Sequence, residues 1–112
     1  MIIETKYNVG HKFTVPRCRK NYVVEELAYE GEVWQRKIDN FEPFTKVKEI
    51  IGIDTYVDKD NKVRVTYKVV TEGDYNNLSQ HYEEDAITDY TKEKAMTIAK
   101  YYAKKGEEYY GN

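Results

Sequence analysis

Cys18 is the only cysteine of the chain, and its neighbours in the sequence suggest a nucleophile. Arg17 and Arg19 lie on either side of it and Lys20 follows, and nearby positive charge lowers the pKa of a thiol and favours the reactive thiolate. A general base would have to come from one of the two histidines. Because reactivity without a base and an orienting group is no catalytic geometry, we expect a protein that binds and does not catalyse a reaction.

The same cysteine could contribute to a zinc site with His11 and His81, if a carboxylate supplied the fourth ligand. The spacing of the three residues matches no zinc finger, so we expect neither a metal nor another cofactor. The stretch "DKDNKVRVTYKVV" begins like a calcium loop but lacks the glycine at its sixth position and the final glutamate, which excludes an EF-hand. The scattered glycines form no phosphate-binding loop.

A basic cluster in "HKFTVPRCRK" interleaves Phe13 with cations, as a groove for single-stranded nucleic acid would. The formal net charge is −2, so the chain as a whole has no basic field that would attract nucleic acid. Acidic residues gather in the later part of the sequence, at Glu72, Asp74, Glu83, Glu84, Asp85 and Asp89. Two interpretations stay open: a dipolar solvated surface, or an acidic face that imitates phosphates and occupies a basic groove of a partner.

Tyrosine is unusually abundant, with 12 residues against one tryptophan and three phenylalanines. A tyrosine can pack its ring while its hydroxyl stays hydrated, which suits a binding surface. Tyrosine is also a good β-former, so the same residues could simply cover half-exposed sheet faces. The aromatic and cationic residues that we expect to contact a partner or ligand are Arg17, Arg19, Lys20, Trp34, Tyr82, Lys100, Tyr101 and Lys104.

The clearest secondary structure is a β-hairpin formed by "KVKEIIGIDTYVD" and "KVRVTYKVV". Apolar residues alternate with charged ones in both segments, which is typical of half-buried antiparallel strands. The intervening "DKDN" supplies the Asp and Asn residues that tolerate turn dihedrals. The alternation predicts one face with Val47, Glu49, Ile51 and Ile53 in the first strand, and one with Val63, Val65, Tyr67 and Val69 in the second.

Other strands are weaker predictions. "YNVGHKFTV" predicts a turn and then a short strand that Pro16 ends, followed by a basic loop at "RCRKN". Residues 22–38 fit two strands that turn at 30–32, because a helix there would have to run through Gly31. "NFEPFT" predicts a loop that bends at Pro43, and "LSQHYEED" a short last strand.

A helix is predicted over about 91–105, with Thr91 as its N-cap and Gly106 as the residue that ends it. Residues 106–112 are then a tail without pattern. We expect the helix to cover the sheet and its Lys-Tyr flank to be free to bind. Its apolar stripe consists of Ala95, Ile98, Ala99 and Tyr102, widened by Met96 and Ala103.

The 112 residues fit a single domain of the α+β class: a bent antiparallel sheet over about 1–82, an SH3-like small barrel being one form of it, with one C-terminal helix. One cysteine allows no intramolecular disulfide and suits a reducing compartment. The N-terminus does not read as a signal peptide, and no apolar run is long enough to cross a bilayer. We therefore expect a cytoplasmic protein without membrane contact.

Three stretches, in order along the chain, resemble small accessory proteins from phages and prophages of Gram-positive bacteria. They are the "KYNVG-KF-VPR" pattern at Lys6 to Arg17, the lysine-rich hairpin at Val47 to Val70, and the "Y-EED" and "KE-A" pattern at Tyr82 to Ala95. The first stretch also resembles the first strand of SH3-like or KOW-type barrels. Some small phage proteins of this size inhibit bacterial immunity, either as anti-CRISPR proteins that block a nuclease or as sponges for a cyclic-nucleotide signal.

The leading hypothesis from this resemblance is a phage-encoded protein that acts in the host cytoplasm and inhibits a host defence protein by direct contact. One alternative is an oligomeric sponge, in which Tyr and Trp stack on a base while Lys or Arg hold phosphates. A second alternative is a small nucleic-acid-binding module, and a third is a structural phage component without a ligand. The resemblance assigns no functional residue to this chain.

Overall fold

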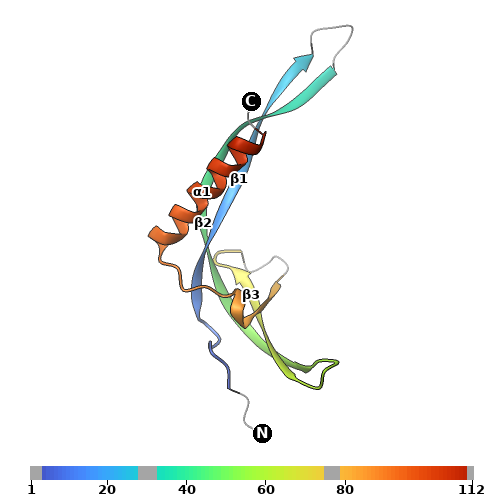
Figure 1. Cartoon of the computed structure of the whole chain (residues 1–112), viewed down its shortest axis with the longest axis vertical. Coiled ribbons are helices and arrows are strands. Elements are labelled where there is room, and N and C mark those ends of the chain that lie inside the picture. Colours follow the sequence, from blue (N-terminus) through green and yellow to red (C-terminus); the bar gives the residue numbers. More distant parts are fainter. Residues whose placement is uncertain (1–3, 28–32, 75–78, 111–112) are drawn as a thin grey trace. The chain divides into compact units, whose positions relative to one another are not determined.

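The computed structural model describes residues 4–27, 33–74 and 79–110, with side chains described at 4–23, 37–74 and 79–110. The strands form one antiparallel sheet in the order β1-β2-β3-β4, and one helix follows at the C-terminus (Figure 1). The fold is therefore α+β, as the sequence predicts. The elements are β1 (Lys12–Leu27), β2 (Val33–Val57), β3 (Val63–Thr71), β4 (Gln80–Glu83), the 3-10 helix η1 (Glu84–Ala86) and α1 (Lys92–Tyr110).

The chain forms two compact units, each assembled from segments that are distant in the sequence. Unit 1 comprises Met1–Val15 and Lys46–Lys92, and unit 2 comprises Pro16–Thr45 and Glu93–Asn112. The long strands β1 and β2 contribute residues to both units. That the 112 residues form a single domain, as their number suggests, remains a prediction.

The core of unit 1 is built from large side chains. Tyr67, Ile50 and Val69 are the largest residues that are fully buried, and they come from the neighbouring strands β2 and β3. The predicted alternation in β3 is confirmed for Val65, Tyr67 and Val69, which face this core, but not for Val63, which is 41% exposed. Among the described residues, the buried members of this core cluster are Tyr7, Phe13, Val15, Ile50, Tyr67, Val69 and Ile87.

A β-bulge changes which residues of β2 face this core. The pairing of β2 with β3 shifts register between Ile50 and Gly52. The one extra residue moves the side chains on its N-terminal side to the opposite face of the sheet from the one that simple alternation predicts. Ile50 is fully buried and Ile53 packs against the core, while Ile51 is 40% exposed. The predicted common face of Val47, Ile51 and Ile53 is therefore wrong on the N-terminal side of the bulge.

The switch of faces at the bulge also buries Lys48, which is only 6% exposed. A lysine can bury its aliphatic stem if its ammonium group finds a partner. The Nζ of Lys48 donates a hydrogen bond to Oγ1 of Thr71 at 2.7 Å. A residue predicted to lie on the charged face thus belongs to the buried one.

The turn between β2 and β3 confirms the prediction from "DKDN". Oδ1 of Asp58 accepts hydrogen bonds from the backbone N–H groups of Asp60 and Lys62, each at 2.9 Å. Asn61 has a φ of 64°, a left-handed conformation that asparagine tolerates better than most residues. The turn is therefore held by the side chain at its first position.

Pro16 and Pro43 do not interrupt their strands, so the predicted strand end, basic loop and bend are wrong. β1 is an edge strand of the sheet, where a residue without an N–H group is tolerated. β3 pairs only with Lys48–Val57 of β2, so Pro43 also lies where β2 has a neighbour on one side. The two strands predicted within 22–38 are confirmed, and their turn at 30–32 lies outside the described residues. The predicted last strand is β4.

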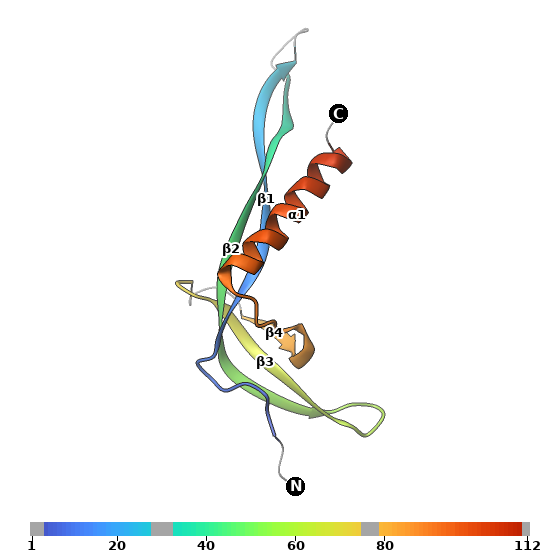
Figure 2. The same cartoon turned by 60° about the vertical axis from the view of Figure 1, so that its left-hand side comes forward.

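Helix α1 runs alongside the β1–β2 hairpin of unit 2 (Figures 1 and 2). Its start after Thr91 and the burial of Ala95, Ala99 and Ala103 are as predicted. Tyr102 was predicted in the buried stripe but is 49% exposed.

The C-terminal end of α1 differs from the prediction, because the helix continues through Gly106 to Tyr110. A Cβ atom at position 106 would lie 2.8 Å from ring carbons of Phe41. Gly106 therefore allows the helix to approach the hairpin closely and does not end it.

Candidate functional site

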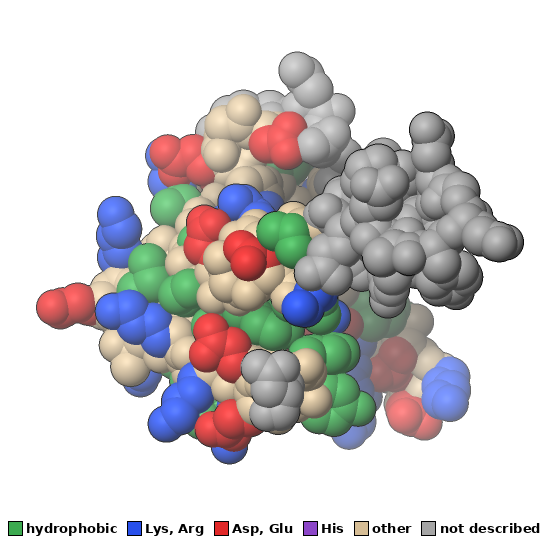
Figure 3. Space-filling model, turned by 90° about the horizontal axis from the view of Figure 1, so that it is seen from above, with side chains coloured by type: hydrophobic (Ala, Val, Ile, Leu, Met, Phe, Trp, Pro, Cys, Tyr) green, Lys and Arg blue, Asp and Glu red, His purple; other side chains and the backbone are tan. Residues whose placement is uncertain are grey.

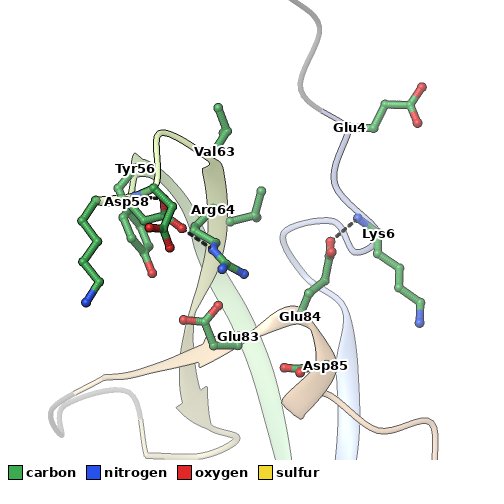
Figure 4. A pocket seen from close by; sticks show the side chains of 12 residues that line it. Glu4, Lys6, Tyr56, Asp58, Val63, Arg64, Glu83, Glu84 and Asp85 are labelled. Atoms are coloured by element: carbon green, nitrogen blue, oxygen red, sulfur yellow. Dashed lines mark hydrogen bonds and ion pairs between the residues drawn. The ribbon is translucent and has the colours of Figure 1, made fainter.

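A hollow of about 950 Å³ lies on unit 1, between the β2–β3 turn on one side and β4 with η1 on the other (Figure 4). The N-terminal segment provides part of its wall. Six carboxylates face three cations, so the hollow is negatively charged, and we call it the acidic hollow. Its lining residues are Glu4, Lys6, Tyr56, Asp58, Lys59, Asp60, Val63, Arg64, Val65, Glu83, Glu84 and Asp85.

A hydrogen-bond network anchors Glu84 at the base of this hollow. The buried Tyr67 donates its hydroxyl proton to Oε1 of Glu84 at 2.6 Å, and the backbone N–H of Lys6 donates to the same oxygen at 2.8 Å. These donors favour the charged carboxylate and hold the pKa of Glu84 below its ordinary value. Burial and the bond to Glu84 raise the pKa of the Tyr67 hydroxyl.

Asp58 and Arg64 fix a second pair of charges at the turn. The Nε of Arg64 lies 2.8 Å from Oδ2 of Asp58. This hydrogen bond, with those from the Lys62 and Asp60 backbone, lowers the pKa of Asp58, and Asp58 in turn raises the pKa of Arg64. Both groups therefore stay ionised at neutral pH.

Glu83 and Asp85 are two of the four carboxylates of the hollow that are exposed and open to a partner, together with Glu4 and Asp60. Within the described part of the chain, neither the Glu83 nor the Asp85 side chain makes a hydrogen bond or ion pair. Glu83 comes from β4, where it pairs with Thr66 of β3. Strand pairing thus brings Glu83–Asp85 to the hairpin that carries Asp58 and Arg64.

Of the predicted contact residues, Lys100, Tyr101 and Lys104 come together on the outward face of α1 in unit 2. All three are exposed, and the ring of Tyr101 is 56% exposed. The spacing of a helix places residues 100, 101 and 104 next to one another on its surface. The ammonium of Lys105 lies 5.6 Å from the centre of the Tyr101 ring.

The cations of the predicted basic cluster, Arg17, Arg19 and Lys20, point to different faces of β1 and contact other residues of unit 2. Successive residues of a strand point to opposite faces, which separates Arg19 from Lys20 on β1. The guanidinium of Arg19 lies 4.7 Å from the centre of the Phe44 ring, and Lys20 donates to the hydroxyl of Tyr110 at 3.3 Å. Arg17 donates to the carbonyl of Pro16 at 2.9 Å. Arg17, Arg19 and Lys20 therefore do not form one cluster on a single face of β1.

That Tyr82 and Trp34 contact a partner or ligand remains a prediction. Tyr82 lies in unit 1 and packs edge-to-face against Phe13, with ring centres 5.7 Å apart. Trp34 lies in β2, and its side chain is outside the described residues.

The residues considered for zinc or nucleophilic chemistry have other surroundings. The ring of His11 lies 4.8 Å from that of Tyr7 in the core of unit 1, and Nε2 of His81 lies 3.5 Å from Asp54. Cys18 is half-buried in β1. Within the described ranges, no group of three or more His, Cys, Asp or Glu residues could hold a metal ion.

Unit 2 has a hollow of its own, of about 1060 Å³, beside the C-terminal end of α1. It contains Lys104 and two aromatic residues that sequence reasoning missed, Phe41 and Tyr110, whose rings stack with centres 5.8 Å apart. The other lining residues are Val23, Lys37, Ile38, Asp39, Asn40, Glu107 and Glu108.

The molecular surface mixes both signs of charge on the face drawn in Figure 3, where Lys and Arg side chains alternate with Asp and Glu. No helix in the described part of the chain has the length and apolar character needed to cross a membrane. Comparisons with protein-family models, with curated proteins and with solved structures found no match to this chain.

Proposed function

We propose that this chain is a protein-binding module that covers a basic surface of its partner with the acidic hollow of unit 1. The observation that carries this proposal is the excess of carboxylates in a hollow where two of them, Asp58 and Glu84, are held in place by hydrogen bonds. Complementary charge steers protein association and determines which partners are rejected.

The pKa shifts support binding over catalysis. A carboxyl group that acts as a general acid at neutral pH needs a raised pKa, as in sites that bury it without charged neighbours. The pKa values of Asp58 and Glu84 are lowered, so both remain anions. Because hydrogen bonds already hold these carboxylates in place, they can attract a cationic partner without changing position when it binds.

The rim of the hollow adds apolar contact area to this charge. Tyr56 is 46% exposed and Val63 is 41% exposed, and both line the hollow. Tyrosine is enriched at protein interfaces, because its ring contributes area while its hydroxyl stays hydrated. A basic side chain of a partner would meet carboxylates and an aromatic ring together.

The experiment that tests this function is quantitative affinity capture from a bacterial lysate with three matched baits. They are the natural chain, the variant with Glu83→Lys and Asp85→Lys, and a control with Asp54→Lys and Asp89→Lys. Both variants change the net charge equally, and the control residues are exposed positions of unit 1 outside the hollow. We expect basic proteins that the natural and control baits retain and the hollow variant loses. Equal retention by all three baits would show that the hollow is not the binding surface.

The target class to test first is a component of bacterial defence, which rests on the sequence resemblance to small phage proteins. We expect expression of the chain to raise the plating efficiency of a phage on cells that carry a defined CRISPR nuclease. The hollow variant should lose this effect while the control variant keeps it. No change in plating across a panel of defence systems would remove this target class.

A further inference from the structure

Helix α1 places its smallest residues inside and its largest outside. Ala95, Ala99 and Ala103 are buried against unit 2, and Gly106 lies over the ring of Phe41. Tyr102 is 49% exposed and Tyr109 is 82% exposed. Covering the hairpin does not require exposed tyrosine rings, so these rings indicate a second packing surface.

The exposed residues on one flank of α1 have the spacing of a coiled-coil seam. We call this row the tyrosine seam, and its members are Ile98, Tyr102, Lys105 and Tyr109. They lie four, three and four positions apart, which is the repeat that keeps a row of side chains facing a neighbouring helix. Ile98 is half-buried, and the ammonium group of Lys105 forms an ion pair with Glu108 at 3.3 Å.

The charge within the seam identifies the occupant. Lys105 is its one charged member, and Tyr102 and Tyr109 lie about one turn before and after it. A parallel copy would set the two Lys105 ammonium groups against each other, which is unfavourable. A second copy that runs antiparallel sets each Lys105 beside a tyrosine ring of the other copy instead.

The antiparallel arrangement also matches the seam residue by residue. It places Ile98 of one copy beside Tyr109 of the other, and Tyr102 beside Lys105. The second contact sets an ammonium group over an aromatic ring, a favourable arrangement that Lys105 already makes with Tyr101. The two Lys105 residues do not face each other in this register.

We propose that the tyrosine seam of α1 is a self-association surface, on which a second copy of the chain packs its own α1 in the antiparallel direction. The contact is isologous, because the same residues contribute from both copies, and it closes as a dimer. This inference goes beyond the proposed function, since it concerns unit 2 and not the acidic hollow.

Sedimentation velocity over a range of protein concentrations tests the association. We expect a dimer that dissociates on dilution, and a variant with Tyr109→Glu whose dissociation constant is larger by about tenfold or more, as for the loss of an aromatic interface anchor. Tyr56→Glu is the matched control, because it makes the same exchange at an exposed tyrosine of unit 1. A monomer at every concentration, or a dimer that Tyr109→Glu leaves unchanged, would overturn the proposal.

Disulfide trapping tests the direction of the pair, with Cys18→Ser in every protein to remove the native thiol. We expect a mixture of Tyr101→Cys and Glu108→Cys proteins to cross-link with each other more rapidly than either does with itself. Cross-linking of the mixture that is no faster than that of each protein with itself would contradict the antiparallel direction. The charge-reversed hollow variant should dimerise normally, so failure of the dimer and failure of the proposed function are separate results.

Discussion

Among their described side chains, unit 1 buries large residues and unit 2 buries small ones. In unit 1, rings and branched chains such as Tyr67, Ile50 and Phe13 are buried, and a network around Glu84 ties the N-terminal segment to the core. Among the described side chains of unit 2, the buried residues are Ala95, Ala99 and Ala103, and large rings such as Tyr101 are exposed.

This difference separates residues that hold the fold from residues available to a partner. Burial of large apolar side chains is the main source of folding free energy, so unit 1 is expected to be the more stable part. A helix that buries only small residues gains less from its own packing and leaves more area for association. The four predictions below test this comparison, from the largest expected effect to the smallest.

Ile50→Ala should cause the largest loss of stability. The side chain is fully buried in unit 1, and truncation of such a residue costs about 2–5 kcal/mol, since it leaves a cavity. The measurement is urea-induced unfolding followed by circular dichroism. Tyr101→Ala, at an exposed site of unit 2, is the control and should change the unfolding free energy by less than about 0.5 kcal/mol. Similar losses in the two variants would refute the comparison.

Tyr67→Phe should have the next largest effect. It keeps the ring in the core but removes the hydroxyl that donates to Glu84 and accepts from the backbone N–H of Tyr7 at 3.3 Å. Leaving the buried N–H group of Tyr7 unsatisfied costs about 1–3 kcal/mol. The loss is measured in the same urea experiment, with Tyr82→Phe as the control, whose hydroxyl contacts only Gln80 among the described residues. An unfolding free energy for Tyr67→Phe equal to that of the natural chain would show that the network adds nothing.

Gly106→Ala should destabilise the packing of α1 on the hairpin by about 1 kcal/mol. The added Cβ meets the Phe41 ring, and overpacking of this kind costs about 1–3 kcal/mol, partly offset by about 1 kcal/mol of better helix propensity. Gly52→Ala in unit 1 is the control, since its Cβ would have an ordinary contact of 3.5 Å with Lys68. Thermal unfolding of both variants gives the answer, and a higher Tm for Gly106→Ala would mean that the helix does not need this close approach.

The pH dependence of unit 1 should show the smallest effect. The folded pKa of Glu84 lies below its ordinary value of 4.5, so its contribution is present above that pH and is lost as the pH falls through the folded pKa. The folded pKa of Tyr67 lies above 10.0, so its contribution is present below that pH and is lost as the pH rises through the folded pKa. We expect the stability difference between the natural chain and Tyr67→Phe to be constant from about pH 5 to 9 and to shrink outside that window. A difference that does not change across the whole range would contradict the assigned shifts.

Patterns that depend on neighbouring residues were predictable from the sequence. The β2–β3 hairpin, its Asp-rich turn, the start of α1 and the burial of its alanines follow from alternation, turn chemistry and helical spacing. The bulge at Ile51 was not predictable, because one inserted residue leaves the composition of the strand unchanged while reversing its faces. The continuation of β1 through Pro16 depends on that strand lying at the edge, which only the sheet order shows.

The candidate sites also differ in whether neighbouring positions in the sequence were enough to predict them. Lys100, Tyr101 and Lys104 were predicted because their spacing within one helix already brings them together. The acidic hollow combines residues 4–6, 56–65 and 83–85, which the pairing of β2, β3 and β4 brings together. The predicted end of the helix at Gly106 is wrong for a related reason, since the Phe41 ring that lies against it is 65 positions away in the sequence.

Hydrogen exchange at two protein concentrations tests the central claim most directly, because it reports the stability of each unit in the same sample. We predict that amides of β3 in unit 1 are the best protected and that their protection does not depend on concentration. Amides of α1 in unit 2 should exchange faster in dilute protein and slow down as the concentration rises and the tyrosine seam is covered. Equal protection of β3 and α1, unchanged with concentration, would contradict both the difference between the units and the association through α1.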